Sequence, residues 1–257
     1  MKLLLVILKN AWFVIKNYFG WIIRYSKKQS SYSIQHRYER LRNFLVEFGK
    51  RLNLKLYISG LDNIKDDENY FFTPNHQGIL DPLLYIMAVE KTTSFVCKYE
   101  GRKIPFIKET MLSIDGEFMK RDDLRQSLKV IKNVSNDLAA DVKSWLVFPE
   151  GTRTKNENFA LNEFKYGTFK VALNSKKAII PVAISGSWRI FSDKTRMKYY
   201  PIQFSFLKPI PYEVYKDMKT KDLAAYVENL VREEHQRLLA NEPKLIKELN
   251  PKIKKII

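Results

Sequence analysis

The sequence has little cysteine and little acidic charge. Cys97 is the single cysteine among 257 residues, which excludes an internal disulfide framework and a metal cluster built on cysteines. Lysine and arginine number 45 against 28 aspartates and glutamates, so the formal charge is +17. A chain this basic favours an anionic partner, which is nucleic acid, an anionic membrane surface or a phosphorylated substrate. A lysine-rich solvated surface accounts for the same composition.

The N-terminus lacks the long apolar run of a signal peptide or a spanning helix. Its first apolar run, Leu3 to Leu8, ends at Lys9, and no small-residue cleavage site follows. Lys9 and Lys16 also interrupt the stretch of about 20 apolar residues that a spanning helix requires. A simple membrane span is therefore not the expected structure.

The basic residues of this segment recur with helical spacing. Lys9 and Lys16 are seven apart, and Arg24 continues a parallel series of polar residues, so on a helix they form one narrow stripe. The opposite face is apolar, and Trp12 and Trp21 suit a membrane interface. The pattern predicts a helix lying in the membrane surface. A span with snorkelling lysines and a helix packed on its own domain are the alternatives.

A polar, serine-rich stretch at 26–35 predicts a hinge, and a second basic amphipathic helix follows it and ends near Gly49. Residues 1–50 are therefore expected to form a two-helix membrane-anchoring module, and residues 51–257 the main domain.

From residue 53, short β-type runs alternate with helical patterns. This alternation predicts an α/β domain with a mostly parallel central sheet flanked by helices. The tail after Pro243 is lysine-rich and is expected to fray. Strands are expected at 54–59, 70–74, 94–98, 145–149, 179–185 and 201–206, and helices at 122–140, 164–174 and 220–240.

One of the three histidines stands in a setting that suits catalysis. His76 follows an apolar strand, and a short loop containing Gly78 leads from it to Asp81. A carboxylate bonded to one ring nitrogen fixes the tautomer and leaves the other nitrogen free as a base. The alternative is that Asp81 caps a helix and His76 supports the turn. His36 and His235 lie in charged helical segments and are expected at the surface.

A second polar turn follows the expected strand at 145–149. Glu150, Gly151, Thr152 and Arg153 continue from Phe148-Pro149. Glycine permits close approach of backbone to a ligand, arginine offers a planar fork for phosphate, and threonine adds a hydroxyl. A plain turn with a surface ion pair is the alternative.

Taken in order, these segments resemble the glycerolipid acyltransferase family. Four motifs carry the resemblance, which extends over residues 50–215. They are Asn75-His76 with Asp81, then Gly116, Phe118, Met119 and Arg121, then FPEGTR at 148–153, and the apolar run Ile180-Pro181-Val182.

The resemblance implies a role for each motif residue. His76 is the base on the acceptor hydroxyl and Asp81 orients it. Lys98 matches a lysine common in bacterial members. Two departures are Gly78, where many bacterial relatives have a small hydroxyl residue, and Lys120, where an acidic or neutral residue is usual. The acceptor's glycerol-phosphate region is bound by Arg121, Glu150, Gly151, Thr152 and Arg153.

The implied reaction moves a fatty acyl group to the sn-2 hydroxyl of lysophosphatidic acid. Acyl-CoA or acyl-carrier protein is the co-substrate, and neither a metal nor another cofactor takes part. The expected location is the cytoplasmic face of the cell membrane, bound to anionic lipids as a monotopic or peripheral protein. Rival interpretations are the same chemistry on glycerol 3-phosphate or another lysophospholipid, a catalytically silent membrane-binding relative, and a nucleic-acid-binding protein. No nucleic-acid-binding motif accompanies the basic charge.

Overall fold

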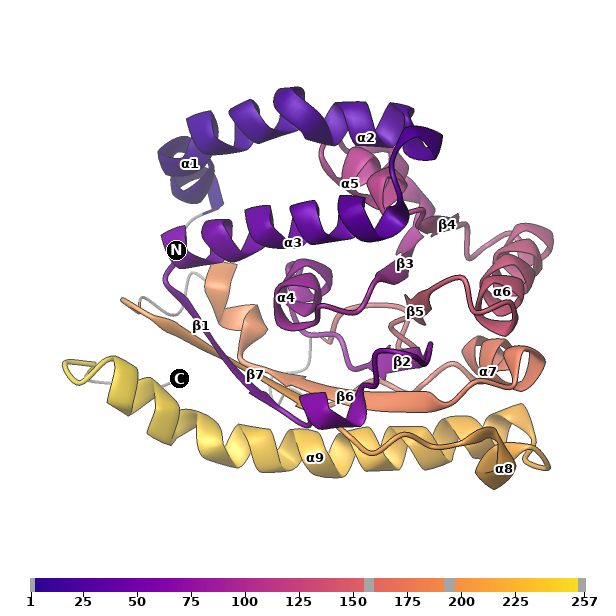
Figure 1. Cartoon of the computed structure of the whole chain (residues 1–257). Coiled ribbons are helices and arrows are strands. Elements are labelled where there is room, and N and C mark those ends of the chain that lie inside the picture. Colours follow the sequence, from indigo (N-terminus) through magenta and orange to yellow (C-terminus); the bar gives the residue numbers. More distant parts are fainter. Residues whose placement is uncertain (1–2, 155–159, 192–196, 254–257) are drawn as a thin grey trace.

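A computed structural model describes residues 3–154, 160–191 and 197–253. Its strands form one sheet in the order β1-β7-β6-β2-β5-β3-β4 (Figure 1). Strands β6, β2, β5, β3 and β4 run parallel, β7 is antiparallel to β6, and β1 is parallel to β7. The expected mostly parallel α/β fold is confirmed. The strands are β1 Leu54–Ser59, β2 Phe71–Pro74, β3 Thr93–Lys98, β4 Glu117–Met119, β5 Ser144–Leu146, β6 Ile179–Ser185 and β7 Tyr200–Phe206.

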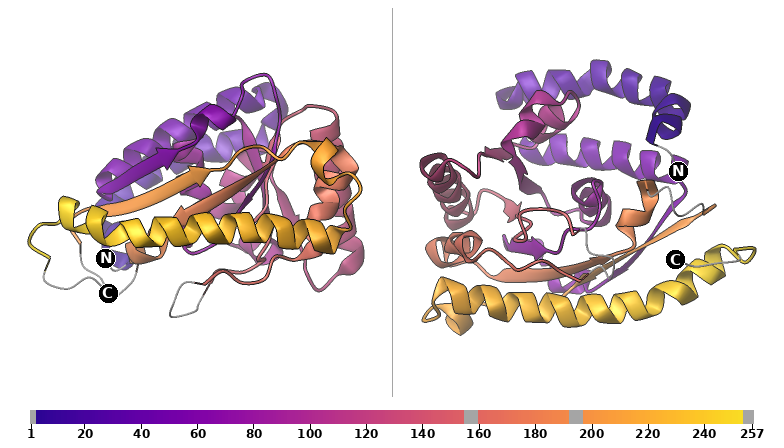
Figure 2. Two further views of the ribbon diagram at one scale, coloured as in Figure 1. Left: turned by 90° about the horizontal axis from the view of Figure 1, so that it is seen from below. Right: turned by 180° about the vertical axis from the view of Figure 1, so that it is seen from behind.

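Helices cover both faces of this sheet. In Figures 1 and 2, α1 to α5 lie on one side, whereas α9 runs along the other with α6 and α7 beside it. The α-helices of the described chain are α1 Leu3–Asn17, α2 Ile23–Lys27, α3 Ile34–Arg51, α4 Asp81–Ala88, α5 Ile107–Ser113, α6 Leu124–Ala139, α7 Lys170–Ser175, α8 Tyr212–Tyr215 and α9 Thr220–Leu249.

Successive residues of the central strands point alternately into two hydrophobic cores, one on each face of the sheet. Phe72 and Ile180 point into the cluster shared with α3, α4 and α5. Their chain neighbours Phe71 and Ile179 point into the cluster shared with α6, α7 and α9. This two-residue alternation explains why the central strands are apolar throughout, because both faces are buried.

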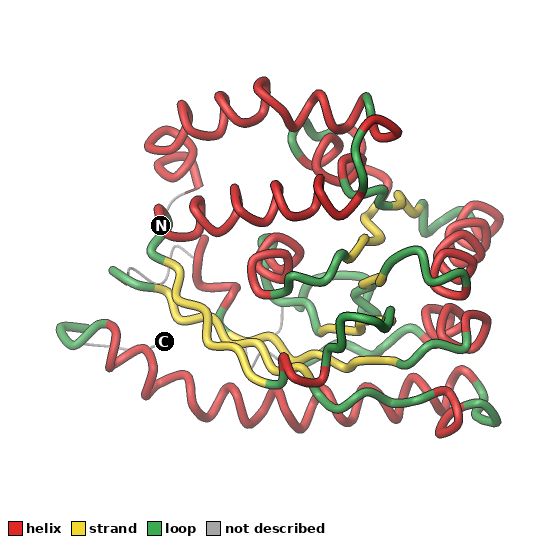
Figure 3. Tube along the Cα trace, viewed as in Figure 1, coloured by secondary structure: helices red, strands yellow, loops and turns green. Residues whose placement is uncertain are grey.

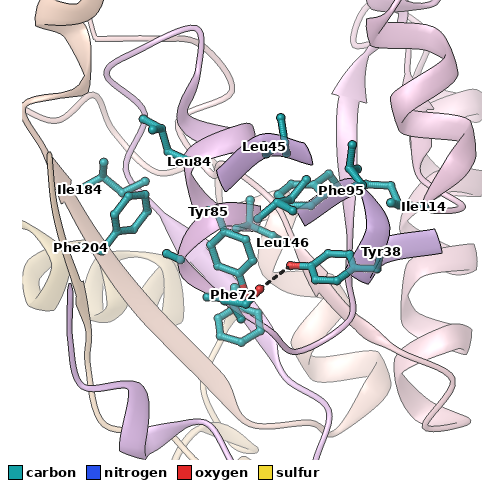
Figure 4. Close-up of a cluster of buried hydrophobic side chains, with 14 of the residues drawn as sticks. Tyr38, Leu45, Phe72, Leu84, Tyr85, Phe95, Ile114, Leu146, Ile184 and Phe204 are labelled. Carbon is teal, nitrogen blue, oxygen red and sulfur yellow. Dashed lines mark hydrogen bonds between the residues drawn. The ribbon is translucent and has the colours of Figure 1, made fainter. Parts of the chain in front are cut away.

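The N-terminal helices pack on the first core. A π-helical segment, Tyr18–Ile22, joins α1 to α2, and residues 28–33, which include the 3-10 helix Gln29–Ser31, lead into α3. Figure 3 shows the helices in red and the loop residues between α2 and α3 in green. Tyr38 and Leu45 of α3 lie among Leu84, Tyr85 and Phe95 (Figure 4). The break between α2 and α3 agrees with the expected hinge. The proposed boundary near residue 50 stays a prediction.

The exposed side of α1 and its continuation is apolar and basic. Leu8, Trp12, Ile15 and Phe19 are exposed, and so are Lys9, Lys16 and Arg24. Trp21, expected at the membrane surface, is instead only 6% exposed. It packs edge-on against Phe44 of α3, so the expectation for this tryptophan is wrong. Among the described residues, no helix has the length and apolar character needed to cross a membrane.

Helix α9 continues beyond its expected end. Pro243 lies inside it, and the helix runs to Leu249. A proline within a helix removes a hydrogen bond and crowds the preceding turn. Here Glu242 pairs with Arg189, and Leu245 and Ile246 are buried. These tertiary contacts hold the helix through the proline, and the prediction of a frayed tail is wrong for residues up to 249.

Candidate active site

Four segments with polar residues lie along the carboxyl ends of four neighbouring strands. His76 follows β2, Phe148 follows β5, Lys98 ends β3 and Arg121 follows β4. These strands are parallel neighbours, so their carboxyl ends lie together, where α/β proteins place ligands. Neighbouring strands are about 4.8 Å apart. The cation after β4 therefore lies roughly 15 Å from the end of β2 along this edge.

Asn75 fixes the point at which the catalytic loop leaves the sheet. Its side-chain amide donates to the Ile184 carbonyl at 3.0 Å, and its side-chain oxygen accepts from the Ile184 N–H at 2.7 Å. The asparagine side chain thus continues the pairing with β6 while the backbone turns away. The loop that starts at His76 is therefore anchored to β6 through Asn75.

His76 and Asp81 are brought together as the sequence predicted. Nδ1 of His76 lies 2.8 Å from Oδ2 of Asp81, which also accepts the backbone N–H groups of Gln77 at 2.7 Å and Gly78 at 2.9 Å. The Asp81 side chain is fully buried, whereas the His76 side chain is 18% exposed. These contacts hold Oδ2 of Asp81 in a fixed position beside the His76 ring.

This arrangement sets the tautomer of His76. When Asp81 Oδ2 accepts from Nδ1–H, Nε2 carries the lone pair and is the ring nitrogen able to take a proton. The carboxylate then stabilises the imidazolium that forms. The pair can therefore act as a general base on a hydroxyl.

The FPEGTR turn supports the histidine from the neighbouring strand. The Phe148 ring stacks on the His76 ring, with centroids 4.1 Å apart. The Thr154 N–H donates to the His76 carbonyl at 2.8 Å, and the His76 N–H donates to Glu150 Oε1 at 2.7 Å. Ring and backbone of the base are both held by this turn.

Glu150 is buried inside this turn and is occupied by protein donors. Its Oε2 accepts from the Thr154 hydroxyl at 2.8 Å and from the backbone and side-chain N–H groups of Asn162 at 2.9 and 2.8 Å. Burial raises the pKa of the Glu150 carboxyl, and these hydrogen bonds oppose the rise. The geometry gives Glu150 a supporting position beneath His76. Its expected contact with substrate stays a prediction.

The turn passes from buried Gly151 to the exposed residues Thr152 and Arg153. Gly151 has φ of +72°, a conformation that favours glycine, and a Cβ there would meet the Lys165 side chain at 3.1 Å. Thr152 and Arg153 are exposed. Arg153 therefore has room to meet an anionic group arriving from solvent.

The strands at the other end of this edge bring two cations toward one carboxylate. Lys98 Nζ lies 2.9 Å from Glu100 Oε1. The pKa of the Glu100 carboxyl is lowered by its hydrogen bond to Lys98 and, more weakly, by the charge of Arg121. All three residues are exposed. Lys98 and Arg121 are thus both close enough to Glu100 to act on its charge, and we call these two cations the cationic cluster; the sequence analysis singled out each cation but not the anion between them.

His235 is not the surface residue that its charged sequence suggested. It is 1% exposed, and its Nε2 lies 2.7 Å from Nε2 of Gln77, the residue after His76. Burial, aided by the charge of Arg232, lowers its pKa from 6.5 to about 4. The ring is therefore neutral near pH 7 and accepts from the Gln77 amide. The charged residues next to it in the sequence suggested an exposed position, but His235 lies on the buried apolar face of α9 with Val231 and Leu238.

Comparisons with known proteins agree with this geometry. A family model described as Acyltransferase matches residues 55–185. A Mycoplasma pneumoniae protein named "Probable 1-acyl-sn-glycerol-3-phosphate acyltransferase" is 33% identical over 62% of this chain and 65% of its own. The Borreliella burgdorferi 1-acyl-sn-glycerol-3-phosphate acyltransferase is 27% identical over 54% of each chain. The chain thus spans less than two thirds of these relatives' lengths.

A solved structure has the same fold. The 1-acyl-sn-glycerophosphate acyltransferase PlsC of Thermotoga maritima superposes with a TM-score of 0.73, covering 92% of this chain and 96% of that one at 23% identity. The family match extends over just more than half of the sequence and contains the histidine–aspartate loop, the cationic cluster and the FPEGTR turn. The chain belongs to the acyltransferase family.

Proposed function

We propose that this protein transfers a fatty acyl group from acyl-CoA or acyl-carrier protein to the sn-2 hydroxyl of 1-acyl-glycerol 3-phosphate. The observation that carries the proposal is the 2.8 Å contact between His76 Nδ1 and the buried Asp81 carboxylate. The names of the relatives support the choice of acceptor, and the exposed cations along the same edge suit its phosphate.

In this mechanism His76 Nε2 takes the proton of the acceptor hydroxyl as its oxygen attacks the thioester carbonyl carbon. A tetrahedral oxyanion forms and collapses, the carbon–sulfur bond breaks, and the imidazolium returns the proton to the leaving thiolate. The products are an ester and a free thiol, with no covalent acyl-enzyme. The proposal requires no metal and no cofactor besides the thioester co-substrate.

Arg121 and Arg153, with Thr152 and the backbone of Gly151, are proposed to bind the acceptor phosphate. Lys98 is proposed to face the same group. The two arginines are exposed and come from the ends of β4 and β5. Arginine binds phosphate through parallel N–H bonds, which orients the glycerol as well as attracting it.

The N-terminal helices are proposed to hold the enzyme on the cytoplasmic face of the cell membrane. Exposed Trp12 and Phe19 lie beside exposed Lys9 and Lys16, which suits an interface of acyl chains and anionic headgroups. Lysolipid and product both reside there.

The deciding experiment measures phosphatidic acid made from lysophosphatidic acid with each thioester donor. Wild type should be active, and His76→Ala should lose almost all activity, whereas His36→Ala, which changes an exposed histidine, should keep it. Absence of product from wild type with both donors would reject this acceptor, and glycerol 3-phosphate and other lysophospholipids would then be assayed. Full activity in His76→Ala would reject the base.

Membrane attachment has a separate test. Trp12→Ser with Phe19→Ser should weaken sedimentation with vesicles containing anionic lipid, because it removes exposed apolar area and leaves buried Trp21 intact. Tyr57→Ser with Tyr226→Ser, which changes exposed aromatics outside α1, is the matched control. Equal binding by all three proteins would reject the attachment by α1.

A further inference from the structure

The two oxygens of Asp81 are used unequally. Oδ2 accepts from His76 Nδ1 and from the N–H groups of Gln77 and Gly78. Oδ1 is equally buried, yet no donor among the described residues reaches it. A buried carboxylate oxygen without a donor is unfavourable, so the half of the carboxylate that faces away from His76 needs a partner.

Ser187 presents a complementary group. It opens the 3-10 helix Ser187–Phe191 directly after β6, and it is 3% exposed. Its hydroxyl is also buried and has no partner in the part of the chain that the structure describes. A hydroxyl can donate, whereas an ionised carboxylate only accepts.

Ser187 Oγ and Asp81 Oδ1 both lie next to the α-carbon of Gly78. A Cβ on Gly78 would lie 2.8 Å from Ser187 Oγ and 3.0 Å from Asp81 Oδ1. Both atoms, together with the Ser187 carbonyl carbon at 3.0 Å, therefore lie where a side chain at residue 78 would otherwise stand. Rotation of a serine about χ1 moves its oxygen between staggered positions, and no side chain of residue 78 stands between hydroxyl and carboxylate.

We propose that the Ser187 hydroxyl donates a hydrogen bond to Asp81 Oδ1 across Gly78 and so positions the carboxylate of the catalytic pair. The bond is charge-assisted and lies in a buried site, where such bonds are strong. It fixes the rotation of the carboxylate about its own axis, which aims Oδ2 at His76. Ser187 is thus a positioning residue that acts on the base through Asp81. The inference rests on the proposed function only for its kinetic consequences.

The first test is kinetic. Ser187→Ala should lower kcat about tenfold, with the KM for lysophosphatidic acid unchanged, because the change acts on the base and not on the acceptor site. Ser187→Cys keeps the branching of the side chain but donates only weakly, and its kcat should fall between those of Ser187→Ala and wild type. Ser175→Ala, which removes another buried hydroxyl in α7, should leave kcat unchanged. An unchanged kcat in Ser187→Ala, or a rise in KM alone, would overturn the proposal.

A second measurement does not depend on activity. Ser187→Ala should lower the urea midpoint of unfolding in the wild-type background, and this drop should shrink by at least half when Asp81→Ala has already removed the carboxylate. Equal drops in both backgrounds would overturn the proposed bond. If wild type makes no phosphatidic acid, the proposed function fails, and this cycle still decides whether Ser187 and Asp81 interact.

Discussion

The two halves of the site differ in how completely the protein occupies them. In the half around the base, Asp81 and Glu150 are buried, and protein donors fill one oxygen of the first and both oxygens of the second. In the cationic half, Lys98, Arg121 and Arg153 are exposed. The first half is held by protein contacts before any substrate arrives, which suits the proposed proton transfer. The second is exposed, and Lys98 is paired there with Glu100, which suits the proposed recognition of the acceptor.

The largest expected effect comes from breaking the buried half at its centre. Asp81→Asn keeps the shape of the side chain but removes the charge that fixes the His76 tautomer and stabilises the imidazolium. We expect kcat to fall about 10³-fold with little change in KM. Asp62→Asn, which changes an exposed aspartate, should have no effect. Equal losses in kcat and in acceptor affinity would contradict the proposal that the buried half serves the chemistry and the exposed half serves acceptor binding.

The next effect concerns His235, which supports the buried half from α9. Its pKa is about 4 in the folded protein and 6.5 ordinarily. Between these values the unfolded chain binds a proton and the folded one does not. The contribution of His235 to the free energy of unfolding is therefore complete above pH 6.5 and is lost as pH falls to about 4, by on the order of 3 kcal/mol.

His235→Gln keeps a hydrogen-bonding group beside Gln77 but cannot titrate. Urea unfolding between pH 6.5 and 4 should therefore show a weaker loss of stability in this variant than in wild type. His36→Gln, at an exposed histidine, should follow wild type. Identical pH dependence in all three proteins would mean that His235 is not held neutral by its burial.

The same contrast explains what the sequence predicts. The His76–Asp81 contact, the FPEGTR turn and the parallel strands each follow from local patterns, and all three are present in the structure. The contact between Gln77 and His235 joins residues 158 apart, and no local pattern announces it. The prediction for Trp21 is wrong because helical spacing shows an apolar face but not whether protein or lipid covers it. The prediction for Pro243 is wrong because the contacts that hold α9 beyond the proline come from distant parts of the chain. β4 and β5 both have three residues, but β5 adjoins the apolar run at 145–149, whereas β4 contains charged Glu117 and is followed by two cations, so no apolar run predicts it.

Acceptor recognition in the exposed half predicts a different kinetic signature. Arg121→Ala should raise the KM for lysophosphatidic acid by about tenfold to a hundredfold, the range for a hydrogen bond to a charged group, and should leave kcat nearly unchanged. Arg125→Ala, at an exposed residue of α6, is the control for net charge. A fall in kcat at saturating acceptor would show that this arginine also orients the reacting hydroxyl.

The smallest effect is expected at Glu100, the anion within the cationic cluster. Glu100→Gln releases Lys98 from its 2.9 Å ion pair and removes a negative charge near Arg121. The KM for lysophosphatidic acid should fall about twofold, since exposed pairs interact weakly, and the gain should fade as salt is raised. Glu68→Gln, which breaks an exposed pair with Lys65, should change nothing. A salt-independent gain would mean that Glu100 acts through the shape of the site, and an unchanged KM would exclude Lys98 and Arg121 from contact with the phosphate.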